Sequence, residues 1–306
     1  MIFCITGQTA TGKTRKAIEL ADEYNGELIN CDARQLYRGI DIVTGKDLDL
    51  TTHTYNLWKQ VENVSLGYYR LKGETGTKLW LYDAVDLTRP FSAYEYRTFV
   101  LTIMKEIIDC GKAPIVVGGT YFYMHNLLYG SVDERIEPDW KLRKKLEKRN
   151  VVELQNLLKK LDARLFKNLS KSEQYNRQRL IRRIEKRMQP TKKIFSQSLK
   201  DVFPTNKVLV LGMKHATREE TMKRVEVRVR KRIRMGAIEE IQKFLSKGYI
   251  KNDPGLKTIG CTQIIKYLQG ETTREEMERE WITKEVQYAK RQLTFMKRDK
   301  HIEWID

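Results

Sequence analysis

The chain has 306 residues, of which 41% are hydrophobic and 32% charged, and its formal net charge is +18. This composition indicates a globular, soluble protein of one large or two smaller domains, and no stretch reaches the ~20 consecutive apolar residues of a membrane-spanning helix. The four cysteines form no C-x-x-C pair and the four histidines are scattered, which disfavours a disulfide framework or a zinc site and fits a reducing cytosol. The N-terminus leads straight into an apolar run, so we expect no signal peptide and a cytoplasmic location.

The first motif is a glycine-rich loop, Gly7–Thr14, which matches G-x-x-x-x-G-K-[ST] in full. It follows the apolar run Met1–Ile5 and precedes apolar residues at helical spacing, the strand–loop–helix context that this pattern requires. Glycines let the backbone wrap a phosphate, loop amides point at it, Lys13 adds a positive charge, and the Thr14 hydroxyl can ligate Mg²⁺. The alternative is a β-turn-α connection without a ligand. We predict a phosphate site that includes Gly7, Thr9, Thr11, Gly12, Lys13 and Thr14.

Two further apolar strands indicate the fold around this loop. Glu27–Asn30 ends just before Asp32, and Ala113–Val117 ends in Gly-Gly-Thr at Thr120, with a helix-capping box at Ser92 between the two strands. Residues that handle ligands in open α/β sheets follow the carboxyl ends of strands, so we expect Asp32 near the phosphate loop. As an alternative, Asp32 caps a helix or holds Mg²⁺ indirectly. The alternation of strands and helices predicts an α/β fold, a P-loop NTPase-like parallel sheet flanked by helices.

A β-rich stretch at 48–80 interrupts this alternation. Short strands are predicted at Thr54–Trp58, Tyr68–Leu71 and Lys78–Tyr82, with glycines at the turns. The sequence assigns no role to this stretch.

From 131 to 190 the pattern is wholly helical and basic. Between Lys141 and Lys200 there are 20 Lys or Arg against 5 Asp or Glu, a net of +15. So long a block of one sign favours a nucleic-acid partner over a merely basic surface. Because Lys207–Gly212 resumes as a sheet strand, we predict a catalytic core at 1–130 and 191–306, and a basic, all-helical insertion at 131–190 with helices at 140–149, 152–161 and 173–188.

Two helices near the C-terminus carry rows of basic residues. Thr217-x-x-Glu220 opens a helix on which Arg224, Arg228 and Arg232 share one face. Thr273-x-x-Glu276 opens a final long helix with Tyr288 and Gln292 on one side and Lys284 and Arg291 on another. Both rows are equally compatible with solvated helix surface.

Six segments in order along the chain resemble one family, the tRNA dimethylallyltransferases, also called tRNA isopentenyltransferases. Together they cover nearly the whole chain, and six ordered matches are far more specific than the glycine-rich loop alone. The segments are Gly7–Thr14, Asp32–Ile42, Pro114–Tyr123, Asn176–Glu185, Ile259–Gln263 with Tyr267–Glu271, and the Y-A-K-R-Q-x-T signature at Tyr288–Phe295. The sequence shows no zinc-finger extension of the kind found in eukaryotic relatives, so the resemblance implies a bacterial-type member. Members of the family are usually monomers, and we expect the same of this chain.

The resemblance implies transfer of a dimethylallyl group from dimethylallyl diphosphate to N6 of adenosine 37 in tRNA. Asp32 would be the catalytic base, with Thr120 at the same reaction centre, and Mg²⁺ on Thr14 would assist the departing diphosphate. Arg224 and Arg228 match positions that close over the diphosphate. It further implies tRNA contacts in the matching segments: Asp32, Arg34, Gln35, Gln178, Arg179, Arg182, Arg183, Lys290 and Arg291.

The sequence departs from the family pattern at several positions. Ala33 replaces a usual serine and Tyr121 a usual glycine, Leu79-Trp80 stands where two histidines are common, and Glu285-Val286 replaces a common Thr-Arg pair before the final signature.

Three other functions are compatible with parts of the chain. One is an adenylate isopentenyltransferase that acts on free nucleotide, which needs no basic insertion. Another is a small-molecule kinase, which would leave the final signature unused. The third is a non-catalytic RNA-binding module, which would not need an intact phosphate loop. The basic block therefore favours a tRNA substrate.

Overall fold

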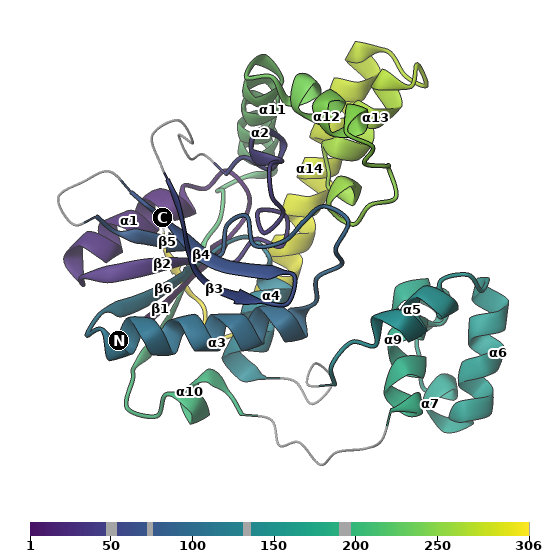
Figure 1. Ribbon diagram of the computed structural model, residues 1–306, viewed down its shortest axis with the longest axis horizontal. Helices are drawn as coiled ribbons and strands as arrows, with labels where there is room; N and C mark the ends of the chain where they lie inside the picture. Colours follow the sequence, from purple (N-terminus) through teal and green to yellow (C-terminus); the bar gives the residue numbers. More distant parts are fainter. Residues whose placement is uncertain (47–53, 72–75, 131–135, 190–196, 306) are drawn as a thin grey trace.

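The computed structural model describes residues 1–46, 54–71, 76–130, 136–189 and 197–305, and centres on an eight-stranded sheet (Figure 1). The strand order is β3-β4-β5-β2-β6-β1-β7-β8, with every pairing from β5 to β8 parallel. The parallel strands are β1 (Ile2–Gly7), β2 (Gly26–Asn30), β5 (Lys78–Trp80), β6 (Ala113–Val117), β7 (Val208–Met213) and β8 (Glu303–Ile305). The predicted mixed α/β fold and its strands around 27–30, 113–117 and 207–212 are confirmed.

Helices cover both faces of the sheet. In β1, Ile2 and Cys4 face one hydrophobic cluster while Phe3 and Ile5 face another, as the two-residue period of a strand requires. The second cluster is closed by α1 (Lys13–Glu23), and the first by α3 (Ala93–Asp109), α4 (Tyr121–Tyr129) and α14 (Arg274–Met296). The predicted capping box at Ser92 is present at the start of α3. Burial on both faces explains why the central strands are almost entirely apolar.

The β-rich stretch extends the sheet at one edge. β3 (Tyr55–Val61) and β4 (Val64–Arg70) form an antiparallel hairpin, and β4 pairs antiparallel with β5. The predicted strands at 54–58 and 68–71 were therefore too short. In β3 the exposed, polar Lys59 and Gln60 interrupt the apolar pattern, whereas the start of β4 that was missed contains the buried Val64 and Leu66. Residues 47–53 and 72–75 of this stretch lie outside the described residues.

A second group of helices stands above one end of the sheet (Figure 1). It contains α2 (Asp41–Thr44), α11 (Arg218–Arg234), α12 (Ala237–Ser246), the 3-10 turn Gly255–Lys257, α13 (Cys261–Leu268) and the first half of α14. The predicted caps at Thr217 and Thr273 are both observed. Glu240 on α12 accepts hydrogen bonds of 2.8–2.9 Å from three amides at the start of α2, so α2 is held against α12. Helix α14 runs from here down to the sheet.

A helical unit, residues 136–189, is set apart from the sheet in Figure 1. It contains α5 (Trp140–Leu146), α6 (Val151–Leu161), α7 (Ala163–Lys167), α8 (Lys171–Gln174) and α9 (Arg177–Met188), and the short α10 (Leu199–Val202) follows it. The unit has its own hydrophobic cluster, which includes Leu154, Leu158, Leu180 and Ile184. The domain boundaries expected at 131 and 190 fall outside the described residues.

The helix predicted at 173–188 is wrong at its start. Helix α8 ends at Gln174, and the side chain of Asn176 accepts a hydrogen bond of 3.1 Å from the Arg179 amide, so it caps a separate helix, α9. Asparagine favours such a cap over a helix interior, and the apolar stripe of the predicted helix, Leu180, Ile184 and Met188, begins only after it. Across the described part of the chain, no helix is long and apolar enough to cross a membrane.

Candidate active site

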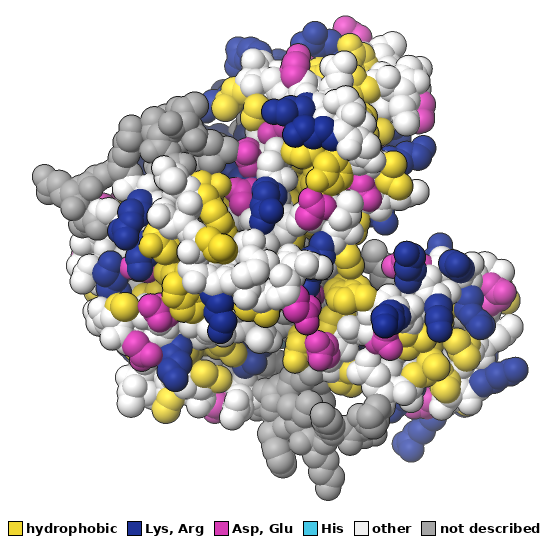
Figure 2. Space-filling view, in the orientation of Figure 1, with side chains coloured by type: hydrophobic (Ala, Val, Ile, Leu, Met, Phe, Trp, Pro, Cys, Tyr) yellow, Lys and Arg dark blue, Asp and Glu magenta, His cyan; other side chains and the backbone are white. Residues whose placement is uncertain are grey.

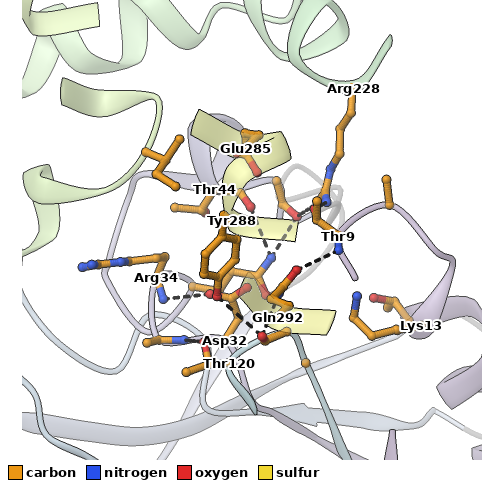
Figure 3. A pocket seen from close by; sticks show the side chains of 18 of the residues that line it. Thr9, Lys13, Asp32, Arg34, Thr44, Thr120, Arg228, Glu285, Tyr288 and Gln292 are labelled. Carbon is orange, nitrogen blue, oxygen red and sulfur yellow. Dashed lines mark hydrogen bonds between the residues drawn. The ribbon is translucent and has the colours of Figure 1, made fainter. Parts of the chain in front are cut away.

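A cavity of about 690 Å³ opens where the carboxyl ends of β1, β2 and β6 meet α2, α11 and α14 (Figure 3). Its lining includes Lys13 from the glycine-rich loop, Asp32 after β2, Thr120 after β6 and Arg228 from α11. Three segments far apart in the sequence thus reach one cavity because the carboxyl ends of parallel strands share one edge of the sheet.

The Gly7–Thr14 loop curls back on itself beneath the cavity. A side chain at Gly7 would collide with the backbone of Met213 on β7, and Gly12 has the left-handed φ of 87° as it leads into α1. The Thr11 hydroxyl and the Lys13 ammonium both donate to the carbonyl of Gln8, at 2.9 and 2.5 Å. The loop therefore holds Lys13 folded over its own backbone at the cavity wall.

The electrostatic surroundings of Lys13 are unusual for a lysine. Burial and the nearby Arg228 guanidinium lower the pKa of Lys13 to about 7, against the opposing influence of Asp32. Both effects disfavour the charged ammonium in the ligand-free protein. An anion that enters the cavity would reverse this balance and restore the full charge.

Asp32 and Thr120 are held by a network of backbone hydrogen bonds. The Asp32 carboxylate accepts from the Arg34 amide at 2.9 Å, and the Thr120 hydroxyl accepts from the Ala33 amide at 2.9 Å. The Thr120 amide in turn donates to the Cys31 carbonyl at 3.0 Å. A turn follows Asp32, so the alternative that it caps a helix is wrong.

Gln292 on α14 joins the two loops. Its carbonyl oxygen accepts from the Thr9 amide at 3.1 Å, and its amide donates to the Gly119 carbonyl at 2.7 Å. Tyr288, one turn earlier, points its hydroxyl at the same carbonyl at 3.5 Å, and burial raises its pKa. The sequence placed both residues on one side of the last helix but gave them no role, although both lie in the family signature.

The two arginines predicted to close over diphosphate lie in different places. Arg228 donates to the Thr9 hydroxyl at 2.7 Å and to the Gly45 carbonyl at 3.2 Å, and so lies against the glycine-rich loop. Arg224 is outside the cavity lining, with a side chain 63% exposed and 3.6 Å from Glu220. Arg232, to which the sequence gave no role, does line the cavity.

The residues predicted to contact tRNA fall into two sets. Arg34, Gln35 and Arg291 line the cavity, while Lys290 is exposed outside its lining. The Gln35 amide already donates to the Gly45 carbonyl at 2.9 Å. The second set lies on α9 in the helical unit and comprises Gln178, Arg179, Arg182 and Arg183.

The arginines of α9 differ in their surroundings. Arg182 and Arg143 both pair with the buried Glu185, so the Arg182 guanidinium helps to hold the helical unit together. Arg183 pairs with Glu173 at 2.8 Å, and Arg179, whose side chain is 58% exposed, lies 3.7 Å from the same carboxylate. Figure 2 shows many Lys and Arg side chains over this unit.

A mainly parallel sheet that gathers Lys13, Arg228, Asp32 and Thr120 around one cavity defines an α/β protein with a cationic site beside a carboxylate. The IPP transferase family matches residues 35–299. The chain belongs to this family.

Individual relatives agree with this assignment. The tRNA dimethylallyltransferase of Endomicrobium trichonymphae is 33% identical, over 99% of this chain and 94% of the relative, and that of Acetivibrio thermocellus is 31% identical, over 100% and 91%. The crystal structure of the full-length tRNA isopentenylpyrophosphate transferase from Bacillus halodurans superposes with a TM-score of 0.66 at 26% identity, covering 100% of this chain and 89% of that one.

Proposed function

We propose that this protein transfers a dimethylallyl group from dimethylallyl diphosphate to N6 of adenosine 37 in tRNA and releases diphosphate. The observation that carries the proposal is the single cavity in which Lys13 and Arg228 face Asp32 and Thr120. Membership of the IPP transferase family and the names of the relatives, tRNA dimethylallyltransferases, support the reaction and disfavour the alternatives.

The cationic end of the cavity suits the leaving group. As the bond between the allyl carbon and oxygen breaks, negative charge grows on the diphosphate, and preorganised cations and amides stabilise it. Lys13 and Arg228 supply the charge, and the amides of Thr11 and Gly12 at the start of α1 are the donors such a loop offers. We infer that the core is P-loop NTPase-like. In this protein the glycine-rich loop would stabilise the diphosphate as it leaves.

Magnesium would assist at Thr14. The Thr14 side chain is exposed and lines the cavity, and no group of three or more metal-ligating side chains occurs among the described residues. Mg²⁺ is commonly held by few protein oxygens together with substrate phosphates and water. One hydroxyl beside the diphosphate site fits that pattern, and the ion would neutralise charge on the leaving group.

The acceptor end provides a base. An exocyclic amine must lose a proton as it attacks, and the Asp32 carboxylate faces the cavity from the carboxyl end of β2. Thr120 is held beside it by the Ala33 amide, and Arg34 lines the same end. A nucleobase that stays stacked in an RNA loop cannot reach Asp32 inside the cavity. Adenosine 37 must therefore flip out of its stack to enter.

We infer that the helical unit is a separate tRNA-binding domain inserted in the catalytic core, because it has its own hydrophobic cluster and a strong positive charge. Lys290 and Arg291 on α14 would extend this contact to the core. We further propose that the protein acts as a monomer in the cytoplasm, where its free cysteines would stay reduced.

A direct assay tests the proposed reaction against its rivals. The protein is incubated with labelled dimethylallyl diphosphate, Mg²⁺ and either unmodified tRNA or AMP, and the label in each product is counted. We expect label in tRNA only. Label in AMP would identify an adenylate isopentenyltransferase, and no label in either would contradict the proposal.

The lowered pKa of Lys13 predicts a pH-dependent affinity for the donor. Diphosphate raises the pKa of a neighbouring lysine, so above pH 7 binding must take up a proton, and affinity falls by up to about tenfold per pH unit. The terminal phosphate has lost its own proton by then, since its pKa is near 6. Isothermal titration between pH 7 and 9, in buffers of different ionisation enthalpy, measures the uptake. In Lys13→Met, weaker binding without the uptake is expected; an unchanged uptake would assign the proton elsewhere.

Arg228 is expected to act on the donor and not on RNA. Arg228→Ala removes a charged donor and should weaken dimethylallyl diphosphate binding about 10–100-fold, while the dependence of tRNA affinity on salt stays unchanged. Arg224→Ala, on the exposed face of the same helix, is the matched control and should leave donor affinity unaltered. A salt slope lowered by about one unit in Arg228→Ala would show a contact with an RNA phosphate instead.

A further inference from the structure

The wall of the cavity opposite the sheet holds an ion pair. Arg232 on α11 and Glu285 on α14 approach to 3.1 Å, with side chains only 7% and 12% exposed. Both line the cavity. Glu285 is one of the positions at which this sequence departs from the family pattern that it resembles.

Arg232 lies next to the arginine that faces the glycine-rich loop. Arg232 donates to the Thr44 carbonyl at 3.2 Å, and Arg228 donates to the neighbouring Gly45 carbonyl at the same distance. A Cβ added at Gly45 would lie 2.4 Å from an Arg232 nitrogen and 2.7 Å from an Arg228 nitrogen. Two guanidinium groups therefore lie side by side, and Glu285 pairs with that of Arg232.

We propose that Glu285 sets how tightly the cavity holds diphosphate, by neutralising Arg232 beside the phosphate-facing Arg228. This rests on the proposed function, in which diphosphate is the leaving group. Two adjacent guanidinium groups and Lys13 would attract a highly charged product strongly, and one buried carboxylate weakens that attraction without touching the phosphate. Glu285 is thus a charge-setting residue for product release and makes no contact with the reacting atoms.

A purely structural role does not explain why the Arg232–Glu285 ion pair lines the cavity. Buried ion pairs add little to stability, since the loss of solvation offsets their attraction. The indole of Trp281, 3.4 Å from the same carboxylate oxygen, anchors Glu285 in place. The pair's clearest effect is on the charge of the cavity.

The test measures binding of inorganic diphosphate at fixed Mg²⁺ by titration calorimetry. Glu285→Gln keeps the shape of the side chain and removes its negative charge, so the affinity for diphosphate should rise about tenfold. This is the order of magnitude that Coulomb's law gives for one unit charge several Å from the ligand at an intermediate dielectric. Arg232→Met should lower affinity, and its thermal unfolding is measured alongside because the substitution leaves the buried Glu285 without its partner. The double variant restores the net charge and should return within about twofold of the parent. Glu280→Gln, on the same helix but paired with Lys266 outside the cavity lining, is the matched control and should not change affinity.

Kinetics supply an independent readout. In Glu285→Gln, slower release should lower the steady-state rate more than the single-turnover rate, and added diphosphate should inhibit at lower concentration. Unchanged or weaker diphosphate binding in Glu285→Gln would overturn the inference. A parent protein that binds no diphosphate would instead overturn the proposed function, so the two failures are distinguishable.

Discussion

Replacing Asp32 by asparagine is expected to lower kcat by about 10²–10⁴-fold, the range that a positioned base contributes. Asparagine keeps an oxygen that can accept from the Arg34 amide, so the turn after β2 is preserved while the proton acceptor is lost. Single-turnover rates with saturating tRNA and dimethylallyl diphosphate measure the effect. Affinity for tRNA should stay nearly unchanged, because the substitution leaves the helical unit intact.

The companion variant is Asp32→Ala, which removes the turn contact as well. A further fall in rate from the asparagine to the alanine variant would measure how much the hydrogen bond from the Arg34 amide contributes to the rate. A loss confined to KM, with kcat intact in both variants, would contradict the role of Asp32 as base and leave it as a binding residue.

The second large effect is expected from the charge of the helical unit. Reversing three exposed lysines, Lys144, Lys145 and Lys148, to glutamate should weaken tRNA binding by orders of magnitude at low salt. Each duplex phosphate contact that is lost should reduce the slope of log K against log salt by about 0.9. Affinity for dimethylallyl diphosphate should not change, since the cavity lies in the core.

The matched control reverses three exposed lysines of the core, Lys105, Lys200 and Lys207, which changes net charge equally. Arg182 is unsuitable for this test because its loss would leave the buried Glu185 short of a partner and destabilise the unit. Replacing 131–190 by a short linker should likewise spare donor binding. Unaltered tRNA affinity in the reversed variant would place the RNA elsewhere, most simply along Lys284 on α14 and Arg298 just beyond its end.

Apolar strand runs and helix caps predicted the core of the fold because each of these patterns depends only on residues close together in the sequence. The apolar strand Ala113–Val117 and the cap at Ser92 needed no knowledge of distant contacts, and both are observed. The break at Asn176 was missed because the apolar stripe Leu180, Ile184 and Met188 lies entirely after it and does not mark where the helix begins. The length of β3 was missed because the exposed, polar Lys59 and Gln60 interrupt its apolar pattern after Trp58.

The residues of the site were predictable only where a motif marks them. Lys13 and Asp32 belong to such motifs and do reach the cavity. Arg224 and Arg228 share a helix face in the sequence, and only the packing of α11 decides that one faces the cavity and the other solvent. Arg232 was missed for the same reason, since its role depends on Glu285, which comes from another helix.

The contact between Gln292 and Thr9 has a consequence for how the chain folds during synthesis. The two residues are 283 positions apart, so the glycine-rich loop lacks one of its supports until α14 has left the ribosome. The parallel pairing of β1 with β7 is similarly delayed. Contacts of such long sequence separation form late. A nascent chain would therefore expose an apolar, incompletely paired β1 edge for most of its synthesis, and that edge is where we expect chaperones to bind.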